Sequence, residues 1–150
     1  MRISPFVPEQ IEGVIELCEQ EGWTTFTEDP ARALRALTAP GVVALVALAD
    51  DGEIVGFAQA LSDGSIQAFL SRVLVAEDAR RSGVGRLLVR EALVRSGALR
   101  MDLLAAEGSE DFYRFFPHRE GRGFRVTLEQ DSEGLASWPP ADLPDPPEPA

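Results

Sequence analysis

Three apolar segments follow one another in this chain with only short turns between them, and this feature limits the chain to a sheet-based fold. The segments cover residues 42–49, 54–61 and 66–75. They are separated by Asp50-Asp51-Gly52 and by a turn at Asp63-Gly64. Turns this short can join strands only when the strands run antiparallel. The sequence therefore predicts three consecutive antiparallel strands in the middle of the chain.

A helix and a fourth strand are predicted to follow this hairpin series. Gly83-Val84-Gly85 opens a helical stretch that continues to about Ser96, and residues 100–105 then read as a strand. A strand, a crossover helix and a further strand form a right-handed unit whose strands run parallel. We therefore expect residues 66–75 and 100–105 to be parallel neighbours.

Helices are predicted on either side of these strands. The apolar residues Ile11, Val14, Ile15 and Cys18 recur at helical spacing after Pro8. A second helix is expected over residues 30–37 with Asp29 as its N-cap. Ser109 would cap a third, short helix that reaches Phe116, and residues 124–128 would form the last strand. The expected fold class is α/β of the α+β kind, a mixed, mostly antiparallel sheet of six to seven strands flanked by about four helices.

The composition excludes several kinds of chemistry. All 14 basic residues are arginine, so a phosphate loop of the Walker type, a pyridoxal Schiff base and a lysine nucleophile are ruled out. With one histidine, His118, and one cysteine, Cys18, no zinc site of Cys and His ligands is expected, and no metal is predicted. The formal charge of −11 argues against nucleic acid and favours a cationic small molecule. The chain has no signal-like N-terminus and no apolar stretch long enough to cross a membrane, which predicts a cytoplasmic protein with no membrane contact.

The last twenty residues differ in composition from the rest. Residues 131–150 contain six prolines after Trp138, five acidic residues and no basic residue. Such a segment cannot join a sheet and has few apolar groups to offset its ordering entropy. We expect one folded domain over residues 1–130 and a disordered acidic tail over 131–150.

The segment from Val73 to Leu88 carries the chemistry. A buried strand leads into a loop with two arginines and two glycines, and this loop opens directly into a helix. Glycine lets backbone N–H groups approach a bulky anion, and the first turn of a helix has unpaired donors at its positive end. The dinucleotide pattern G-x-G-x-x-G fails at Leu88, whereas R-x-x-G-x-G fits from Arg80 to Gly85.

With this loop in this position, the sequence resembles the GCN5-related N-acetyltransferase (GNAT) superfamily, whose hallmark is Q/R-x-x-G-x-G/A between its fourth strand and third helix. The resemblance extends from about Ile3 to Leu128. It implies acyl transfer from acetyl-CoA, coenzyme A being held along the fourth strand and by the loop. The cofactor-binding residues implied are Val73, Leu74 and Val75 for the pantetheine arm, Arg80, Arg81, Ser82, Gly83, Val84, Gly85 and Arg86 for the diphosphate, and Ser109. A backbone N–H near Val75 would face the developing oxyanion.

Phe112-Tyr113 resembles the start of the family element F-Y-x-x-x-G-F, which implies that Tyr113 is catalytic and protonates the departing thiolate. Pro117 and His118 stand where glycine and phenylalanine are expected. Either six residues are inserted before Gly123, or residues 116–119 form a short strand paired with 124–128. We favour the second alternative.

The family often has a glutamate on the fourth strand as general base, but Ser71 and Arg72 occupy this region. The remaining candidates for the base are Glu21, Glu28, Asp63 and Glu107. The resemblance places Trp23 in the acceptor pocket, where it would bind the substrate. The predicted function is N-acetylation of an amine on a small molecule or peptide, and polyamines, aminoglycosides and basic peptides all fit an acidic protein. A non-catalytic acyl-CoA-binding or regulatory module of the same fold is the alternative. Homodimers are common in the family, so the resemblance also implies a second copy of this chain as a possible partner.

Overall fold

The computed structural model describes residues 1–126. By its internal contacts the chain divides into two compact units, Met1–Phe116 and Pro117–Ala150. The first unit holds every helix and strand of the described residues, whereas residues 117–126 of the second unit form neither. The predicted tail over residues 131–150 lies outside the described residues, and the domain boundary at residue 130 stays a prediction.

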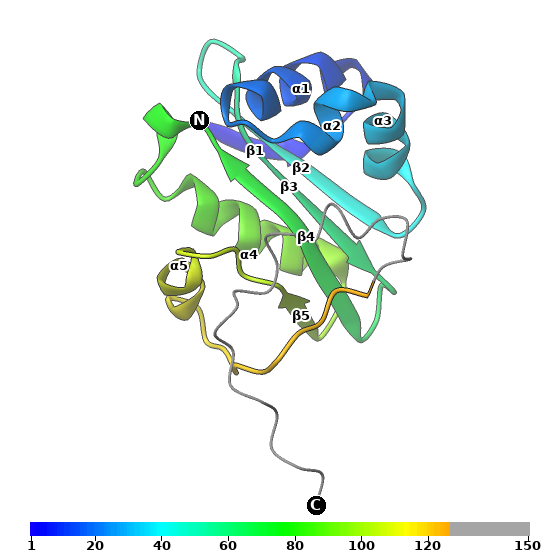
Figure 1. Ribbon diagram of the computed structural model, residues 1–150, viewed down its shortest axis with the longest axis vertical. Helices are drawn as coiled ribbons and strands as arrows, with labels where there is room; N and C mark the ends of the chain where they lie inside the picture. The colour runs from blue at the N-terminus through cyan, green and yellow to red at the C-terminus, as the bar shows by residue number, and fades with distance from the viewer. Residues whose placement is uncertain (127–150) are drawn as a thin grey trace, which may run out of the picture. The chain divides into compact units, whose positions relative to one another are not determined.

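A single five-stranded sheet organises the first unit, with the order β1-β2-β3-β4-β5 (Figure 1). Its strands are β1 (Arg2–Pro5), β2 (Val42–Leu48), β3 (Ile54–Ser62), β4 (Gln67–Val75) and β5 (Arg100–Leu103). Neighbours from β1 to β4 are antiparallel, and β5 is parallel to β4. The predicted hairpin series and the parallel pair are thus confirmed, and so is the fold class.

Helices cover both faces of this sheet. Helices α1 (Ile11–Gln20), α2 (Thr24–Glu28) and α3 (Pro30–Thr38) lie together on one face, after the 3-10 turn η1 (Pro8–Gln10) (Figure 1). On the other side of the sheet are α4 (Val84–Ser96) and the short α5 (Glu110–Arg114); a second 3-10 turn, η2 (Glu77–Ala79), precedes α4. As predicted, Asp29 caps α3 by accepting a hydrogen bond of 3.0 Å from the backbone N–H of Arg32. No helix of residues 1–126 is long and apolar enough to span a bilayer.

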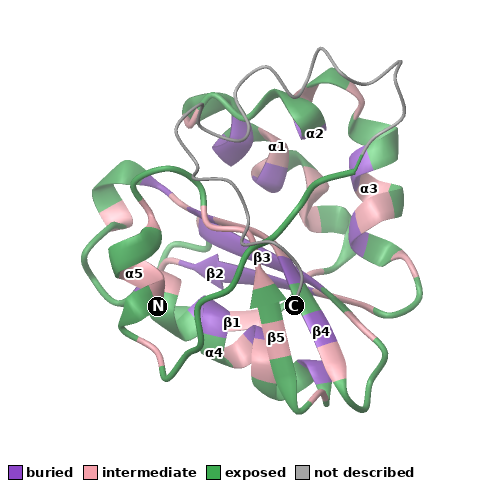
Figure 2. Cartoon of the chain, turned by 60° about the horizontal axis from the view of Figure 1, so that its bottom comes forward, coloured by how far each residue is buried: buried purple, intermediate pink, exposed green. Residues whose placement is uncertain are grey.

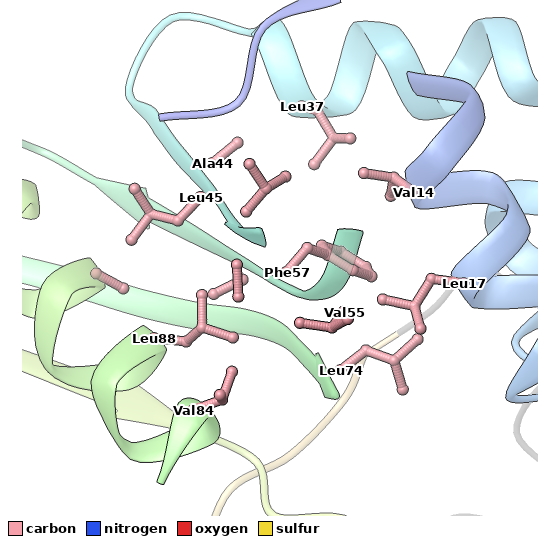
Figure 3. Close-up of a cluster of buried hydrophobic side chains, with 14 of the residues drawn as sticks. Val14, Leu17, Leu37, Ala44, Leu45, Val55, Phe57, Leu74, Val84 and Leu88 are labelled. Atoms are coloured by element: carbon pink, nitrogen blue, oxygen red, sulfur yellow. The ribbon is translucent and has the colours of Figure 1, made fainter. Parts of the chain in front are cut away.

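The hydrophobic core lies on both faces of β2 and β3, whose residues are largely buried (Figure 2). Val14 and Leu17 of α1 approach Phe57 and Leu74 from one face, while Val84 and Leu88 of α4 pack from the other (Figure 3). On α4 the residues Val84, Leu88 and Ala92 recur every four positions and are all buried. This packing fixes the two helical layers against the central strands and thereby places the ends of β4 and α4.

The structure differs from the predicted fold in several elements. The sequence analysis missed β1 and α2, which are too short, at four and five residues, to show a periodic pattern. The helix after Ser109 ends at Arg114 instead of Phe116, and the Ser109 side chain makes no cap hydrogen bond. Six to seven strands were expected, but the described residues form five.

The missing strands were predicted at residues 116–119 and 124–128. Residues 117–119 and 124–126 are not strands, while 127 and 128 lie outside the described residues. The stretch 117–126 has few apolar residues to bury, and two of them, Phe124 and Val126, are 79% and 92% exposed. Without a buried face, nothing specifies a strand register there.

Candidate functional site

A β-bulge in β4 separates this strand from β5. Gln59 of β3 pairs with Arg72, but Ala60 pairs with Leu70, so Ser71 is an extra residue on β4. Pairing between β4 and β5 ends at the same point, with Leu70 opposite Leu103. A bulge bends its strand and increases the local twist. Beyond Ser71, β4 therefore runs on without β5 beside it, and the two strands part towards the end of the sheet where α4 begins (Figure 1).

The free edge of β4 presents backbone groups to this opening. The N–H of Ala76 donates to the carbonyl of Val55 in β3 at 2.9 Å. Because successive residues of a strand direct their N–H groups to opposite edges, those of Val73 and Val75 point away from β3. Leu74 lies between them with its side chain buried in the core. The strand can thus pair with an extended ligand arm along the opening.

The loop that follows η2 supplies unpaired backbone donors. Within residues 1–126, no hydrogen bond is made by the N–H groups of Arg81, Ser82, Gly83, Val84, Gly85 and Arg86. The first backbone hydrogen bond of α4 is donated by the N–H of Leu87 to the carbonyl of Gly83 at 3.1 Å. Six successive donors at the positive end of a 13-residue helix make a cradle for a large anion. The amide of Arg80 is not part of it, since it donates to Glu77.

The shape of this cradle depends on its two glycines. Gly83 has a φ of +90°, and a Cβ atom there would meet nothing within 4 Å, so its exposed side faces open space. At Gly85 a Cβ would lie 3.2 Å from the ring of Phe112 and 3.6 Å from Cγ2 of Val75. Glycine at this position allows the start of α4, the end of β4 and α5 to meet.

The three arginines near the cradle, two in the loop and Arg86 in the first turn of α4, have different surroundings. Arg80 forms an ion pair with Glu21, and its Nε donates to the carbonyl of Val75 at 3.1 Å. Arg81 is exposed and takes the left-handed conformation with a φ of +59°. The guanidinium of Arg86 lies over the ring of Phe115, 3.5 Å from the ring centre. Of these side chains, Arg80 is directed back towards the sheet end.

Helix α5 brings Tyr113 and Ser109 to the same end of the sheet. Tyr113 packs edge-on against Phe112, whose ring contacts the start of α4, and burial raises the pKa of the Tyr113 phenol above its ordinary value of 10.0. The Ser109 hydroxyl donates to the carbonyl of Ala106 at 2.7 Å and keeps its oxygen lone pairs for other donors.

The candidates for a general base lie in different places. Asp63 is in the turn before β4, where the N–H groups of three following residues lower the pKa of its carboxyl. Val75 is at the other end of the same strand, about 30 Å away at the rise of an extended chain, so Asp63 lies far from the end of β4 that leads to the cradle. Glu28 is exposed at the end of α2, and Glu107 is exposed on the loop between β5 and α5. Glu21 has an ion-pair partner in Arg80.

The position of the expected strand glutamate is taken by a different network. Ser71 is the bulged residue, and the Arg72 guanidinium donates to Gln59 and Ser71 at 3.2 and 3.1 Å. The same guanidinium lies 4.7 Å from the ring centre of Phe26 in α2. Trp23, the expected acceptor-binding residue, is 38% exposed in the loop between α1 and α2. Sequence reasoning missed the Ser71 bulge, because only the strand register shows which residue is extra.

Comparison with known proteins bears on this arrangement. A protein-family model described as the acetyltransferase (GNAT) family matches residues 9–116. No relative was found among curated proteins. A solved structure with a TM-score of 0.68 is the apo aminoglycoside antibiotic 6'-N-acetyltransferase AAC(6')-IG from Acinetobacter haemolyticus. It is 19% identical, and the match covers 86% of this chain and 98% of that one.

Two further solved structures have the same fold. A putative acetyltransferase from Agrobacterium tumefaciens is 22% identical with a TM-score of 0.68, and the match covers 85% of this chain and all of that one. AAC(6')-Iy, solved in complex with a bisubstrate analog, CoA-S-monomethyl-acetylneamine, is 19% identical with a TM-score of 0.67. That match covers 85% of this chain and 97% of the other.

Proposed function

Because the chain belongs to the GNAT acetyltransferase family, whose members are acyltransferases that use acetyl-CoA, we propose that it is an N-acetyltransferase acting on an amine by direct attack. The observation that carries this proposal is the row of unpaired backbone N–H groups from Arg81 to Arg86 beside the free edge of β4. An anion cradle next to an unpaired strand edge suits a substrate that has a diphosphate at one end and an amide-containing arm at the other.

The residues of the chain fit coenzyme A along this line. The amides of residues 81–86 would hold the diphosphate, and the Ser109 oxygen, whose proton goes to the carbonyl of Ala106, would accept from an N–H of the pantetheine arm. Val73 and Val75 would pair with the pantetheine arm through their backbone groups, with Leu74 anchoring the strand in the core. The carbonyl of Val75 accepts from Arg80, so Val75 meets the thioester end of the arm through its N–H, which would donate to the developing oxyanion.

Tyr113 is the proposed general acid. Its raised pKa keeps the phenol protonated at neutral pH, and the neutral phenol is the form that can donate a proton to a thiolate. When a thioester bond breaks, the sulfur needs a proton, and Tyr113 is the only tyrosine of the chain.

An acceptor amine also has to lose a proton. An alkylammonium of pKa about 10.4 is about 0.04% free amine at neutral pH, so a base raises the reactive fraction. Asp63 lies at the far end of β4 and Glu21 is paired with Arg80, so we propose Glu28 or Glu107 for this role, directly or through water. Trp23 would line the acceptor site with its exposed ring. The acidic charge of the protein and the aminoglycoside acetyltransferases among its structural neighbours favour a cationic small-molecule amine as acceptor.

Two measurements test the proposal. Calorimetry should show binding of CoA to the purified protein, and an amine panel with acetyl-CoA should release free thiol at a rate above background for at least one amine. Absence of heat with CoA would overturn the diphosphate cradle. Binding of CoA without thiol release for any amine would favour a non-catalytic module.

A further inference from the structure

We propose that Glu21 is a positioning residue that ties the loop between α1 and α2 to the cofactor loop, and that it is not the general base. This proposal rests on the proposed function, because it assigns a role within the same site. It concerns three contacts that converge on the segment from Val75 to Arg80, which joins the free edge of β4 to the anion cradle.

The backbone of Glu21 is fixed by the way α1 ends. Gly22 has a φ of +72°, and its N–H donates to the carbonyl of Glu19 at 3.2 Å. The N–H of Trp23 donates to the carbonyl of Cys18 at 2.8 Å. These two bonds are the Schellman motif, with Glu21 as C-cap and Gly22 in the left-handed conformation. Since Cys18 is buried in the core, Glu21 starts from a rigid point.

Both carboxylate oxygens of Glu21 are engaged. Oε1 accepts a hydrogen bond of 3.0 Å from the backbone N–H of Glu77, the first residue of η2, and Oε2 accepts from Nη2 of Arg80, the residue just after η2. The Glu21 side chain is only 13% exposed. One carboxylate thus holds both ends of the turn that leads from β4 to the cradle.

Arg80 extends this contact to the strand edge. Its Nε donates to the carbonyl of Val75 while Nη2 pairs with Glu21. The guanidinium fork therefore links the end of β4 to the loop that carries Trp23. The charge of Arg80 is thus already paired with a carboxylate. We infer that Arg80, the first residue of R-x-x-G-x-G, supports the cradle from behind and does not bind the diphosphate, which is bound by the backbone N–H groups.

The arrangement predicts how Glu21 contributes to the reaction. Replacing Glu21 with Gln keeps an oxygen for the N–H of Glu77 but removes the charge opposite Arg80. The cradle and the β4 edge would then be held less firmly, so binding of CoA weakens. Because Glu21 does not take the substrate proton, turnover at saturating acetyl-CoA should fall far less than the loss of about 100-fold expected when a general base is removed.

The test is a double-mutant cycle with CoA affinity as the first readout. Glu21→Gln and Arg80→Ala should each raise the Kd of CoA about tenfold, and the double variant should bind no more weakly than the weaker single variant. Glu19→Gln is the matched control, with the same change of charge on an exposed side chain two residues earlier, and it should bind CoA as the wild type does. At saturating acetyl-CoA, kcat of Glu21→Gln should fall far less than about 100-fold, and the pH dependence of kcat should match the wild type.

Three results would overturn the proposal. Additive losses in the double variant would make Arg80 an independent phosphate ligand. A fall in kcat of about 100-fold in Glu21→Gln with an unchanged Kd for CoA would make Glu21 the base. A cycle in which Glu21→Gln binds CoA as well as the control would show that the contact positions nothing.

Failure of the proposed function can be told apart from failure of this inference. If the wild-type protein gives no heat with CoA, the proposed function is wrong. The wild type, Glu21→Gln, Arg80→Ala and the double variant are then compared by thermal unfolding without ligand. Non-additive losses of Tm would retain Glu21 as a brace of the Val75–Arg80 segment, whereas additive losses would reject it.

Discussion

A Cβ atom on Gly85 would lie 3.2 Å from ring atoms Cε2 and Cζ of Phe112, so the first turn of α4 and helix α5 meet at a glycine. The Phe112 ring is held in turn by the rings of Tyr113 and Phe116, whose centres lie 4.9 and 5.9 Å away. This contact places Tyr113 relative to the cradle, which makes it part of the proposed site as well as of the packing.

Gly85→Val should therefore destabilise the protein, by about 1–3 kcal/mol, because its side chain overlaps a ring that has little room to move. The free energy of unfolding from denaturant titration measures this. In a Phe112→Leu background the same substitution should cost clearly less, since the ring is gone. An equal cost in both backgrounds would show that the contact with Phe112 is not the cause.

Substitution of Gly83 should affect the binding of coenzyme A. A valine there is strained by its φ of +90° and fills open space beside the unpaired amides, so we expect the Kd of CoA to rise at least about tenfold. Gly64→Val is the matched control. Gly64 also has a positive φ and open space around it, but it lies in the turn at the far end of β4, so that variant should lose stability and keep its CoA affinity. Equal affinities of Gly83→Val and the wild type would count against the cradle.

Tyr113→Phe removes the proposed acid while leaving the ring in place. Since general acid catalysis typically contributes 100-fold or more, kcat should fall about 100-fold with little change in the Kd of CoA. Burial raises the pKa of Tyr113, so the phenol stays protonated below its ordinary pKa of 10.0. The wild-type kcat should consequently show no loss from Tyr113 ionisation up to about pH 10. A Tyr113→Phe variant with wild-type kcat would assign the proton to another donor.

Cys18 should make the stability of the fold depend on pH in the alkaline range. Burial raises the pKa of its thiol from 9.0 to about 11, with the Arg72 charge acting in the opposite direction. Because the pKa of the thiol is higher in the folded chain than in the unfolded chain, its contribution to the free energy of unfolding is fully present below pH 9. That contribution is lost as the pH rises from 9 through 11. A difference of two pKa units corresponds to about 3 kcal/mol in the free energy of unfolding.

Cys18→Ala should be less stable than the wild type at pH 7, because it leaves a cavity. Its free energy of unfolding should, however, fall less steeply between pH 9 and 11. Chemical denaturation at a series of pH values compares the two slopes, and parallel curves would show that the thiol does not titrate as described.

Much of the fold could be predicted from local pattern. The turns at Asp50-Asp51-Gly52 and Asp63-Gly64, the cap at Asp29 and the four-residue spacing on α4 act over short stretches of chain, and the structure confirms the elements they indicate. The prediction failed where an element is short, as for β1 and α2, or where strands were expected over residues 116–119 and 124–128, which have too few apolar residues to bury.

The cofactor loop of the proposed site could be located from the sequence, but its contacts with the rest of the chain could not be predicted. Arg80 to Gly85 can be recognised because the backbone conformation of a glycine loop before a helix is a local property. The partners of that loop are not local. Glu21 lies 59 residues before Arg80, and Phe112 comes 27 residues after Gly85, so no spacing rule connects them.

The sequence by itself thus determined the longer strands and helices, and it located the loop with unpaired backbone donors, because these depend on turn residues, caps and apolar periodicity within a few residues. The tertiary structure alone decided that Ser71 is the bulged residue where β4 separates from β5, that Arg80 pairs with Glu21, and that the ring of Phe112 packs against Gly85. These relationships arise only when the packing of α1, α4 and α5 on the sheet brings distant segments together, because side-chain contacts depend on distance in space and not on separation along the chain.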